Sequence, residues 1–187
     1  MALFVDATKT SSWWYSGGGL YTDVSLVATA PLHVDFDGID AWSSVNEQAI
    51  SLDEKLSAPG RAVLRASVAS LSATVDLTLD ANSTVAGYSG SQQAAVQIEV
   101  LDDSGHVVGT ATSDAVTVAP GTLVTATTVS VPVPQARLWS VQDPYLYTLR
   151  ATVLRGGASG TAVDAVEVQV GVRSVSFDSD TGFSLNG

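Results

Sequence analysis

The sequence predicts an all-β protein, folded as an antiparallel immunoglobulin-like β-sandwich. Three observations predict this fold. Apolar and polar residues alternate along most of the chain, turn residues separate the alternating segments, and valine, alanine, threonine and serine are plentiful. The 187 residues are enough for one sizeable domain with its own core.

The first clear strand is predicted in the segment PLHVDFDGI. Its alternation places Leu32, Val34 and Phe36 on one face. The polar residues between them share the other face: His33, Asp35 and Asp37. Because the side chains of a strand point alternately to its two sides, we expect the apolar face to pack into the core.

Later segments alternate in the same way, and each predicts a strand with one apolar face. In chain order these faces are Val75, Leu77 and Leu79; Val96, Ile98 and Val100; Val129, Val131 and Val133; Tyr145, Tyr147, Leu149, Ala151 and Val153; and Val166, Val168 and Val170. Asp102 to Gly105 predict a turn into a return strand. The closing segment, RSVSFDSDTGFSLNG, predicts two short strands across a turn from Asp178 to Gly182.

Other segments are less regular. NEQAISLDEKLSAPGRAVLRAS fits either a turn of helix before Pro59-Gly60 or an insertion loop before a strand near residues 63–68. A polar loop is expected over residues 82–93. Near the N-terminus, SSWWYSGGGLYTDVSLVAT predicts an aromatic and glycine cluster that runs into a strand, whose one face is Val24, Leu26 and Ala28. The strands expected at both ends lack partners, so we expect a piece of a longer protein.

Charge and composition narrow the classes of partner. The formal net charge is −11 and the pI is about 4.2, so nucleic acid and anionic membranes are disfavoured while neutral sugars are not. The absence of cysteine excludes disulfides and thiolate zinc sites but does not fix the compartment. No apolar stretch approaches the roughly 20 residues that cross a bilayer, and the first residues do not resemble a signal peptide.

Three motifs resemble glycoside hydrolase family 2, which includes β-galactosidases, β-glucuronidases and β-mannosidases. They are WYSGGGLYTDV at residues 14–24, LWSVQDPYLYTL at residues 138–149 and GVRSVSFDSDTGFSLNG at residues 171–187. Their order and spacing resemble the family over nearly the whole chain. Trp13 and Thr22 depart from the family pattern, which often has arginine at these positions.

The resemblance implies an organisation in three parts. Residues 1–30 would be the C-terminal tail of a sugar-binding jelly-roll domain, residues 31–175 an immunoglobulin-like sandwich, and residues 176–187 the lead-in to a catalytic barrel. In this interpretation Asp143-Pro144 is a turn before a late strand. Tyr145 and Tyr147 then pack into or against the core and do not bind sugar.

Glycoside hydrolysis needs two carboxyl groups that face one sugar. The resemblance implies that both are glutamates on barrel strands beyond Gly187. The glutamates of this chain match no catalytic motif of the family, and we expect them on the surface: Glu47, Glu54, Glu99 and Glu167. The sequence therefore predicts no catalytic residue here.

We also expect no metal site and no catalytic nucleophile. The segment from Asp178 to Gly182 resembles the opening of a calcium loop, but its place between two short strands favours a plain turn. A weaker cation candidate is the group Asp35, Asp37 and Asp40. The histidines, His33 and His106, lie in separate predicted strands, and no nucleophile motif accompanies the serines. We expect no cofactor.

Two surface features remain. Asn82-Ser83-Thr84 fits a glycosylation sequon. The cluster Trp13-Trp14-Tyr15 is the best candidate for a sugar contact, because aromatic faces stack on pyranose rings. We favour packing of these rings between two domains, since Gly17-Gly18-Gly19 after them suits a structural junction.

The resemblance implies a non-catalytic spacer domain of an enzyme that hydrolyses terminal β-glycosides with retention, with β-galactosides as the first substrate to consider. Its partners would be the sugar-binding domain and the barrel, and its exposed ends could also pair with a second copy. The alternative is a free-standing immunoglobulin-like module for carbohydrate binding or adhesion. The sequence that follows Gly187 would distinguish these two hypotheses.

Overall fold

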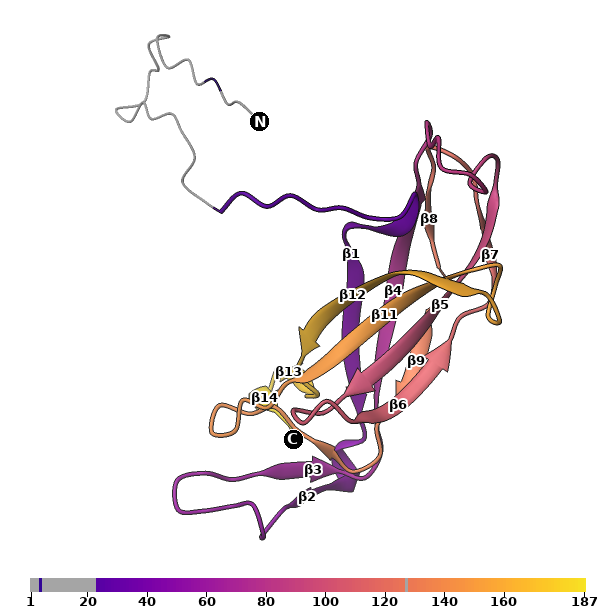
Figure 1. The fold of residues 1–187 in the computed structure, drawn as a ribbon. Helices are drawn as coiled ribbons and strands as arrows, with labels where there is room; N and C mark the ends of the chain where they lie inside the picture. The colour runs from indigo at the N-terminus through magenta and orange to yellow at the C-terminus, as the bar shows by residue number, and fades with distance from the viewer. Residues whose placement is uncertain (1–3, 5–22, 127) are drawn as a thin grey trace.

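The computed structural model describes residues 4, 23–126 and 128–187, which form antiparallel β-sheets packed as a sandwich (Figure 1). The predicted all-β fold class is confirmed. One layer contains β1 (Leu32–Val45), β4 (Ala69–Leu79), β8 (Leu123–Thr125) and β9 (Val129–Pro132). The other contains β5 (Gln92–Leu101), β6 (Val107–Thr112), β7 (Val116–Val118), β11 (Tyr147–Arg155) and β12 (Thr161–Val170).

Between the two layers lies the core, and the period-two pattern locates most of it correctly. β11 is central in its layer, paired with β5 on one side and β12 on the other. The predicted inward faces of β4, β5, β9 and β11 are buried. Those of β12 are partly buried and pack against the core: Val166, Val168 and Val170. This burial of valine and leucine is the main favourable contribution to folding.

Phe36 is the exception on β1, because the predicted inward position is wrong. Its side chain is 83% exposed. The register with β4 shifts between Val34 and Ile39, and Asp37 has a positive φ of 55°. A bulge of this kind inserts extra residues into one strand, which reverses the sides to which later side chains point. At the bulge, the Val34 N–H donates to the Asp164 carboxylate of β12 at 2.9 Å, which ties the two layers together.

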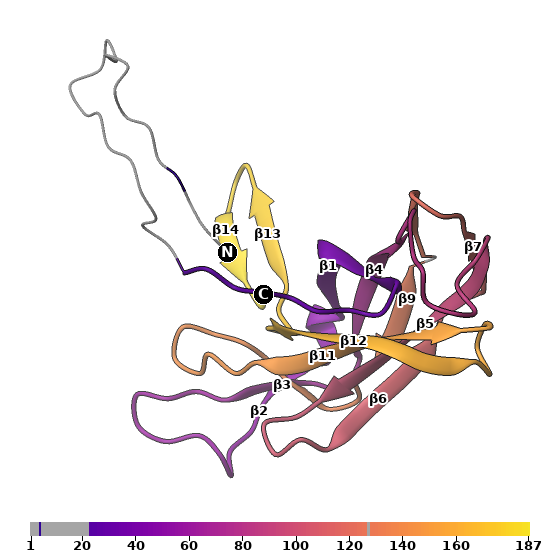
Figure 2. The ribbon, with the colours of Figure 1, turned by 45° about the horizontal axis from the view of Figure 1, so that its top comes forward.

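The structure of residues 46–68 matches neither of the two predicted alternatives completely. A short 3₁₀ turn, η1 (Glu47–Ala49), comes first, and then β2 (Ile50–Leu52) pairs with β3 (Leu64–Ala66). We call residues 50–66 the arm, which extends beyond one end of the sandwich (Figure 2). β10 (Ala136–Arg137) pairs with β3 and so links the arm to the segment that leads into β11. The helical turn therefore exists but is brief, and the strand after it is shorter than expected.

The N-terminal segment also differs from its prediction. Residues 23–30 form no strand with any described part of the chain, and Val24 and Leu26 are 57% and 95% exposed. The alternation there lacks a partner strand, and a strand without a hydrogen-bonded neighbour is not maintained. The cluster Trp13-Trp14-Tyr15 lies outside the described residues.

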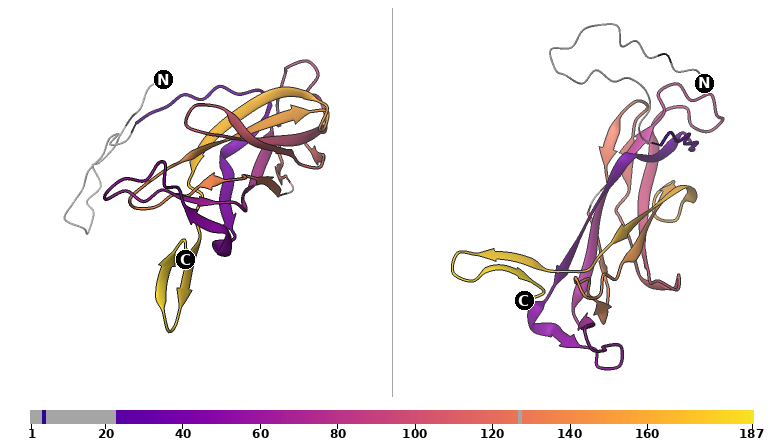
Figure 3. Two further views of the ribbon diagram at one scale, coloured as in Figure 1. Left: turned by 90° about the horizontal axis from the view of Figure 1, so that it is seen from below. Right: turned by 90° about the vertical axis from the view of Figure 1, so that its left-hand side faces the viewer.

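Both remaining turn predictions hold. The turn at Asp102 to Gly105 is closed by a hydrogen bond from Gly105 N to Asp102 O at 3.0 Å. The closing hairpin consists of β13 (Val175–Asp178) and β14 (Gly182–Leu185), and it projects away from the sandwich (Figure 3). The loop predicted over residues 82–93 ends slightly earlier, because β5 begins at Gln92. Over the described ranges, no helix has the length and apolarity needed to cross a membrane.

Candidate functional site

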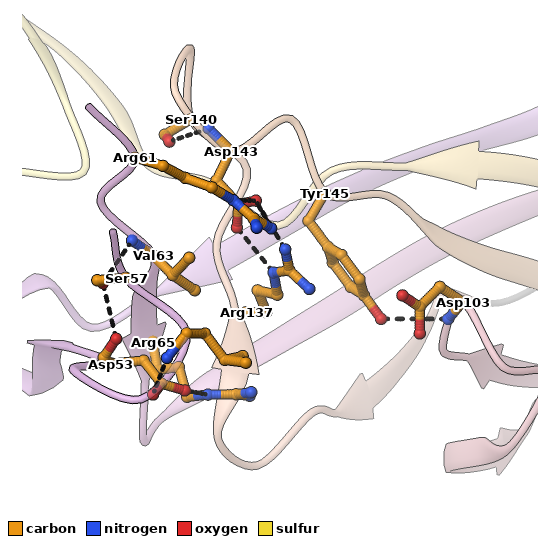
Figure 4. A network of polar contacts seen from close by, with 11 residues as sticks. Asp53, Ser57, Arg61, Val63, Arg65, Asp103, Arg137, Ser140, Asp143 and Tyr145 are labelled. Atoms are coloured by element: carbon orange, nitrogen blue, oxygen red, sulfur yellow. Dashed lines mark hydrogen bonds and ion pairs between the residues drawn. The ribbon is translucent and has the colours of Figure 1, made fainter. Parts of the chain in front are cut away.

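A group of charged side chains surrounds Asp143, in the loop between β10 and β11 (Figure 4). The Asp143 side chain is only 4% exposed. Its carboxylate accepts two hydrogen bonds from Arg137, both at 2.7 Å, and two from Arg61, at 2.8 and 3.2 Å. We call this group of Asp143, Arg61 and Arg137 the knot. Charge-assisted bonds of this bidentate kind are the stronger ones in proteins.

Backbone bonds fix the loop that carries Asp143. The Asp143 N–H donates to the Ser140 hydroxyl at 3.0 Å, and its carbonyl accepts from the N–H groups of Ser140 and Tyr145 at 2.9 and 2.8 Å. The predicted turn at Asp143-Pro144 lies slightly earlier, with the bends at residues 141 and 142. These bonds satisfy polar groups that burial would otherwise leave unpaired.

Tyr145 and Tyr147 pack against this knot and the core, as predicted. Their rings meet edge to face at 4.9 Å, and the Arg137 guanidinium lies 4.3 Å from the centre of the Tyr145 ring. The Tyr145 hydroxyl accepts from Asp103 N at 3.1 Å, while the Tyr147 hydroxyl accepts from Arg137 N at 2.8 Å. Burial raises the pKa of both phenols. Each hydroxyl therefore accepts a hydrogen bond from the backbone of the fold.

The electrostatics of the knot favour its charged state. The Arg137 guanidinium, and after it Arg61, hold the pKa of Asp143 below its ordinary value, while burial acts in the opposite direction. Asp143 in turn raises the pKa of Arg137. A general acid has to carry a proton near neutral pH, so Asp143 is suited to holding the fold and unsuited to protonating a leaving group.

The arm is fastened by the knot and by a second ion pair. Arg61 belongs to the arm, so its bond to Asp143 joins the arm to the loop before β11. Arg65 donates to Asp53 at 2.6 Å and to the carbonyl of Gln135 at 2.8 Å. Ser57 adds a bridge within the arm, since it donates to Asp53 O and accepts from the N–H of Val63 (Figure 4). The arm is therefore held in one position relative to the sandwich.

A second network lies on the outer face of the β5–β11–β12 layer. Arg150 is paired in register with Glu99 on one side and Glu167 on the other, and it contacts their carboxylates at 3.5 and 2.7 Å. We call these three residues the ladder. Both glutamates lie on the outer face, as predicted, with side chains 25% and 51% exposed. Glu47, in η1, and Glu54, in the arm, are exposed as well.

The other candidates are separated from one another. His33 bonds to the carbonyl of Ala30 at 2.9 Å, whereas His106 is 80% exposed and lies 3.4 Å from Asp102. The Asp178 carboxylate accepts from the N–H groups of Thr181 and Asp180, and these bonds lower its pKa. Those contacts are the ones a plain turn makes. Among the described residues, no group of three His, Cys, Asp or Glu side chains could hold a metal ion.

Two further candidates lie on exposed backbone. Asp37 and Asp40 of the weaker cation group are exposed, and Asp35 is half-buried. Asn82 of the sequon is exposed in the loop before β5.

Sequence reasoning missed the knot itself. Arg61 and Asp143 are 82 positions apart, and the pairing of β3 with β10 helps to bring them together. The available signal was the pair Arg137 and Asp143, which flank the motif LWSVQ in a chain with few basic residues.

Comparison with known proteins gives a consistent result. The family model described as glycosyl hydrolases family 2 matches residues 61–173. The chain is 34% identical, over its whole length, to the β-galactosidase BoGH2A of Bacteroides ovatus, and covers 19% of that protein. It is 23% identical over 94% of its length to a β-glucuronidase of Formosa agariphila, and covers 16% of it. The chain thus spans about a fifth or less of these curated relatives.

Solved structures show the same fold. The chain superposes on a β-glucuronidase from Bacteroides uniformis with a TM-score of 0.63 and 22% identity, over 98% of this chain and 20% of that one. A family 2 glycosyl hydrolase from Bacteroides cellulosilyticus gives a TM-score of 0.62 and 19% identity, over 85% of this chain and 18% of that one.

Proposed function

Because the chain belongs to the glycosyl hydrolases of family 2, we propose that it is a non-catalytic immunoglobulin-like spacer within a longer enzyme. Residues 31–175 are the spacer, residues 1–30 the tail of a sugar-binding domain and residues 176–187 the lead-in to a catalytic barrel. The longer enzyme hydrolyses terminal β-glycosides with retention. The spacer holds the sugar-binding domain and the barrel in a fixed relation.

The ladder is the observation that carries the proposal. Retaining hydrolysis needs two carboxyl groups about 5 Å apart with a sugar between them. Glu99 and Glu167 are the two glutamates that share one face, and the space between them holds the guanidinium of Arg150. A sugar would have to displace an arginine that both carboxylates already bind. This arrangement supports a surface role for the pair.

A spacer has to be rigid where it meets its neighbouring domains. One end of this molecule is held by several such contacts. The knot fixes the arm and the loop before β11. The base of the closing hairpin is fixed too, because the Asn186 side chain donates to the carbonyl of Trp139 at 3.1 Å and accepts from Ser174 N at 3.1 Å. Three segments distant in sequence are therefore joined at the same end (Figure 1).

A β-galactoside is the proposed substrate class of the longer enzyme. The support is the identity of 34% over the whole chain to a β-galactosidase, against 23% to a β-glucuronidase.

Hydrolysis assays on the purified chain test the non-catalytic role. We expect no release of nitrophenol from nitrophenyl β-galactoside, β-glucuronide or β-mannoside above a buffer blank. Turnover that co-purifies with the chain, and that is lost in Glu99→Gln or Glu167→Gln, would contradict the proposal. Sequencing beyond the codon for Gly187 separates the spacer from a free-standing module. A barrel with two glutamates at strand ends supports the spacer, and further sandwich repeats or a stop codon support the module.

We also propose that the exposed N-terminal segment mediates self-association of the isolated chain. Val24 and Leu26 are largely exposed, and apolar segments of this kind are templates for contact with a second molecule. Light scattering on the chain with and without residues 1–28, a deletion that removes Val24 and Leu26, tests this. We expect dimers or larger species only when these residues are present. If both samples are monomeric at tens of micromolar, roughly the concentration range in which such contacts form, the proposed self-association is wrong.

A further inference from the structure

A hollow of about 580 Å³ lies at the end of β12, where the chain continues into the closing hairpin. Its volume is within the roughly 300–1,000 Å³ of pockets that bind small molecules. The residues that matter for its chemistry are Trp42, Ser43, Trp139, Gln169, Gly171 and Arg173. Among the described residues that line the hollow, none is an aspartate or a glutamate, so its one formal charge is positive in a protein whose net charge is −11.

Arg173 is the unusual member of this hollow. Its guanidinium lies over the Trp139 ring, 4.9 Å from the centre. Within the described part of the chain it forms no side-chain hydrogen bond and no ion pair, whereas Arg61, Arg65, Arg137 and Arg150 each bind a carboxylate. A guanidinium has five N–H donors in a planar fork that matches a carboxylate. The donors of Arg173 are thus available to a ligand.

The backbone around Arg173 and Trp139 is fixed before any ligand arrives. The Ser43 hydroxyl of β1 donates to the Arg173 carbonyl at 2.6 Å and accepts from its N–H at 3.1 Å. Trp139 N donates to Val172 O at 2.8 Å. Gly171 permits the indole to lie this close, because a Cβ there would come within 2.9–3.1 Å of three Trp139 side-chain atoms. Such pre-organisation lowers the entropic cost of binding.

The remaining surfaces of the hollow suit a sugar ring. The Trp42 side chain contributes to the lining and the residue is 43% exposed. The Gln169 amide donates through Nε2 to Thr148 at 3.3 Å, which leaves its carbonyl oxygen as an acceptor for a hydroxyl. An aromatic face, an amide and a free guanidinium together match a ring with hydroxyl groups and one carboxylate.

We propose that this hollow binds a carboxylate-bearing sugar, with room for one hexuronic acid residue, and that Arg173 binds the carboxylate. The proposal goes beyond the spacer role and does not rest on it. Attraction by the whole protein does not contribute, since the net charge of −11 repels anions, so binding would report the local chemistry of the hollow.

Titrations followed by NMR chemical shifts test the proposal on the whole chain, with glucuronate, glucose and acetate as probes. We expect glucuronate to bind at least about tenfold more tightly than glucose, because a hydrogen bond to a charged group is stronger than one to a neutral group. Arg173→Gln should remove this preference. Arg173→Lys, which keeps the charge but loses the fork, should retain part of it.

Arg155→Gln is the matched control. Arg155 also lies over an aromatic ring, that of Tyr88 at 4.4 Å, and has no ion pair among the described residues, but it is not part of this hollow. The variant changes the net charge equally and should bind glucuronate like the unmodified chain. Equal binding of glucuronate and glucose, or equal effects of Arg173→Gln and Arg155→Gln, would overturn the proposal. Acetate that binds as tightly as glucuronate would overturn the sugar part of it.

Discussion

The knot and the ladder each join three charged residues, and they differ in burial. In the knot, the central Asp143 side chain is 4% exposed, and its partners come from the arm and from β10. In the ladder, the central Arg150 side chain is 36% exposed, and its partners come from the strands on either side of it. A buried carboxylate that loses its partners is left with an uncompensated charge, whereas a surface charge is taken up by water.

The two networks therefore have different consequences for the fold. The pairing of β11 with β5 and β12 is already set by backbone hydrogen bonds, so the ladder adds little that the sheet lacks. The arm has less support of this kind, because its backbone pairing with the rest of the described chain consists of the two residues of β10 and a hydrogen bond from Leu138 N to Leu64 O at 2.8 Å. Asp143 adds a further connection between the arm and the loop before β11. Burial, and the number of chain segments that an ion pair joins, decide how much the ion pair contributes to the stability of the fold.

Loss of the central carboxylate should have the largest effect. Asp143→Asn leaves Arg61 and Arg137 without their counter-charge, and we expect a loss of about 3–5 kcal/mol in the free energy of unfolding. Urea denaturation measures this. Asp53→Asn, which breaks the other ion pair of the arm, serves as a comparison and should cost less. If both variants unfolded at the urea midpoint of the unmodified chain, the knot would have no special role.

Truncation of the core behind the ladder should come next. Leu149 precedes Arg150 on β11, points into the core and is fully buried, so Leu149→Ala should cost about 2–5 kcal/mol. Its urea midpoint should fall far below that of Glu167→Ala. Coincident midpoints for the two variants would mean that the inward and outward faces of β11 are assigned the wrong way round.

Acid should weaken the knot progressively. The pKa of Asp143 is lowered in the folded state, chiefly by Arg137, so its contribution is present above the unfolded pKa of about 3.9 and is lost as the pH falls through the folded pKa. Stability of the unmodified chain should therefore drop below about pH 4, and that of Asp143→Asn should drop less. Other carboxyls with a lowered pKa are common to both proteins: Asp53, Asp102 and Asp178. Parallel pH profiles would contradict the assignment.

The smallest effect is expected at the edge of the ladder. Glu167→Ala removes a half-exposed carboxylate, and the free energy of unfolding should change by no more than about 0.5 kcal/mol. Thermal unfolding at low and high salt checks this, because screening weakens surface ion pairs. A loss as large as that of Asp143→Asn would remove the contrast between the two networks.

Periodicity located the core but not the features that depend on distant residues. The inward faces of β4, β5, β9 and β11 follow from local alternation. The prediction that Phe36 points inward is wrong because the bulge in β1 depends on the partner strand. The prediction of a strand through Val24 and Leu26 is wrong because alternation alone does not supply a neighbouring strand. The knot needed the approach of Arg61 to Asp143 across 82 positions, for which one sequence holds no signal.

The double-mutant cycle between Arg137 and Asp143 tests most directly whether a buried charge network stabilises this fold. The free energies of unfolding of Arg137→Gln, Asp143→Asn and the double variant give the coupling energy of the pair. We predict a coupling of about 2 kcal/mol or more, and a much smaller one for the matched cycle between Arg150 and Glu167. Equal coupling in the two cycles, or none between Arg137 and Asp143, would contradict the account.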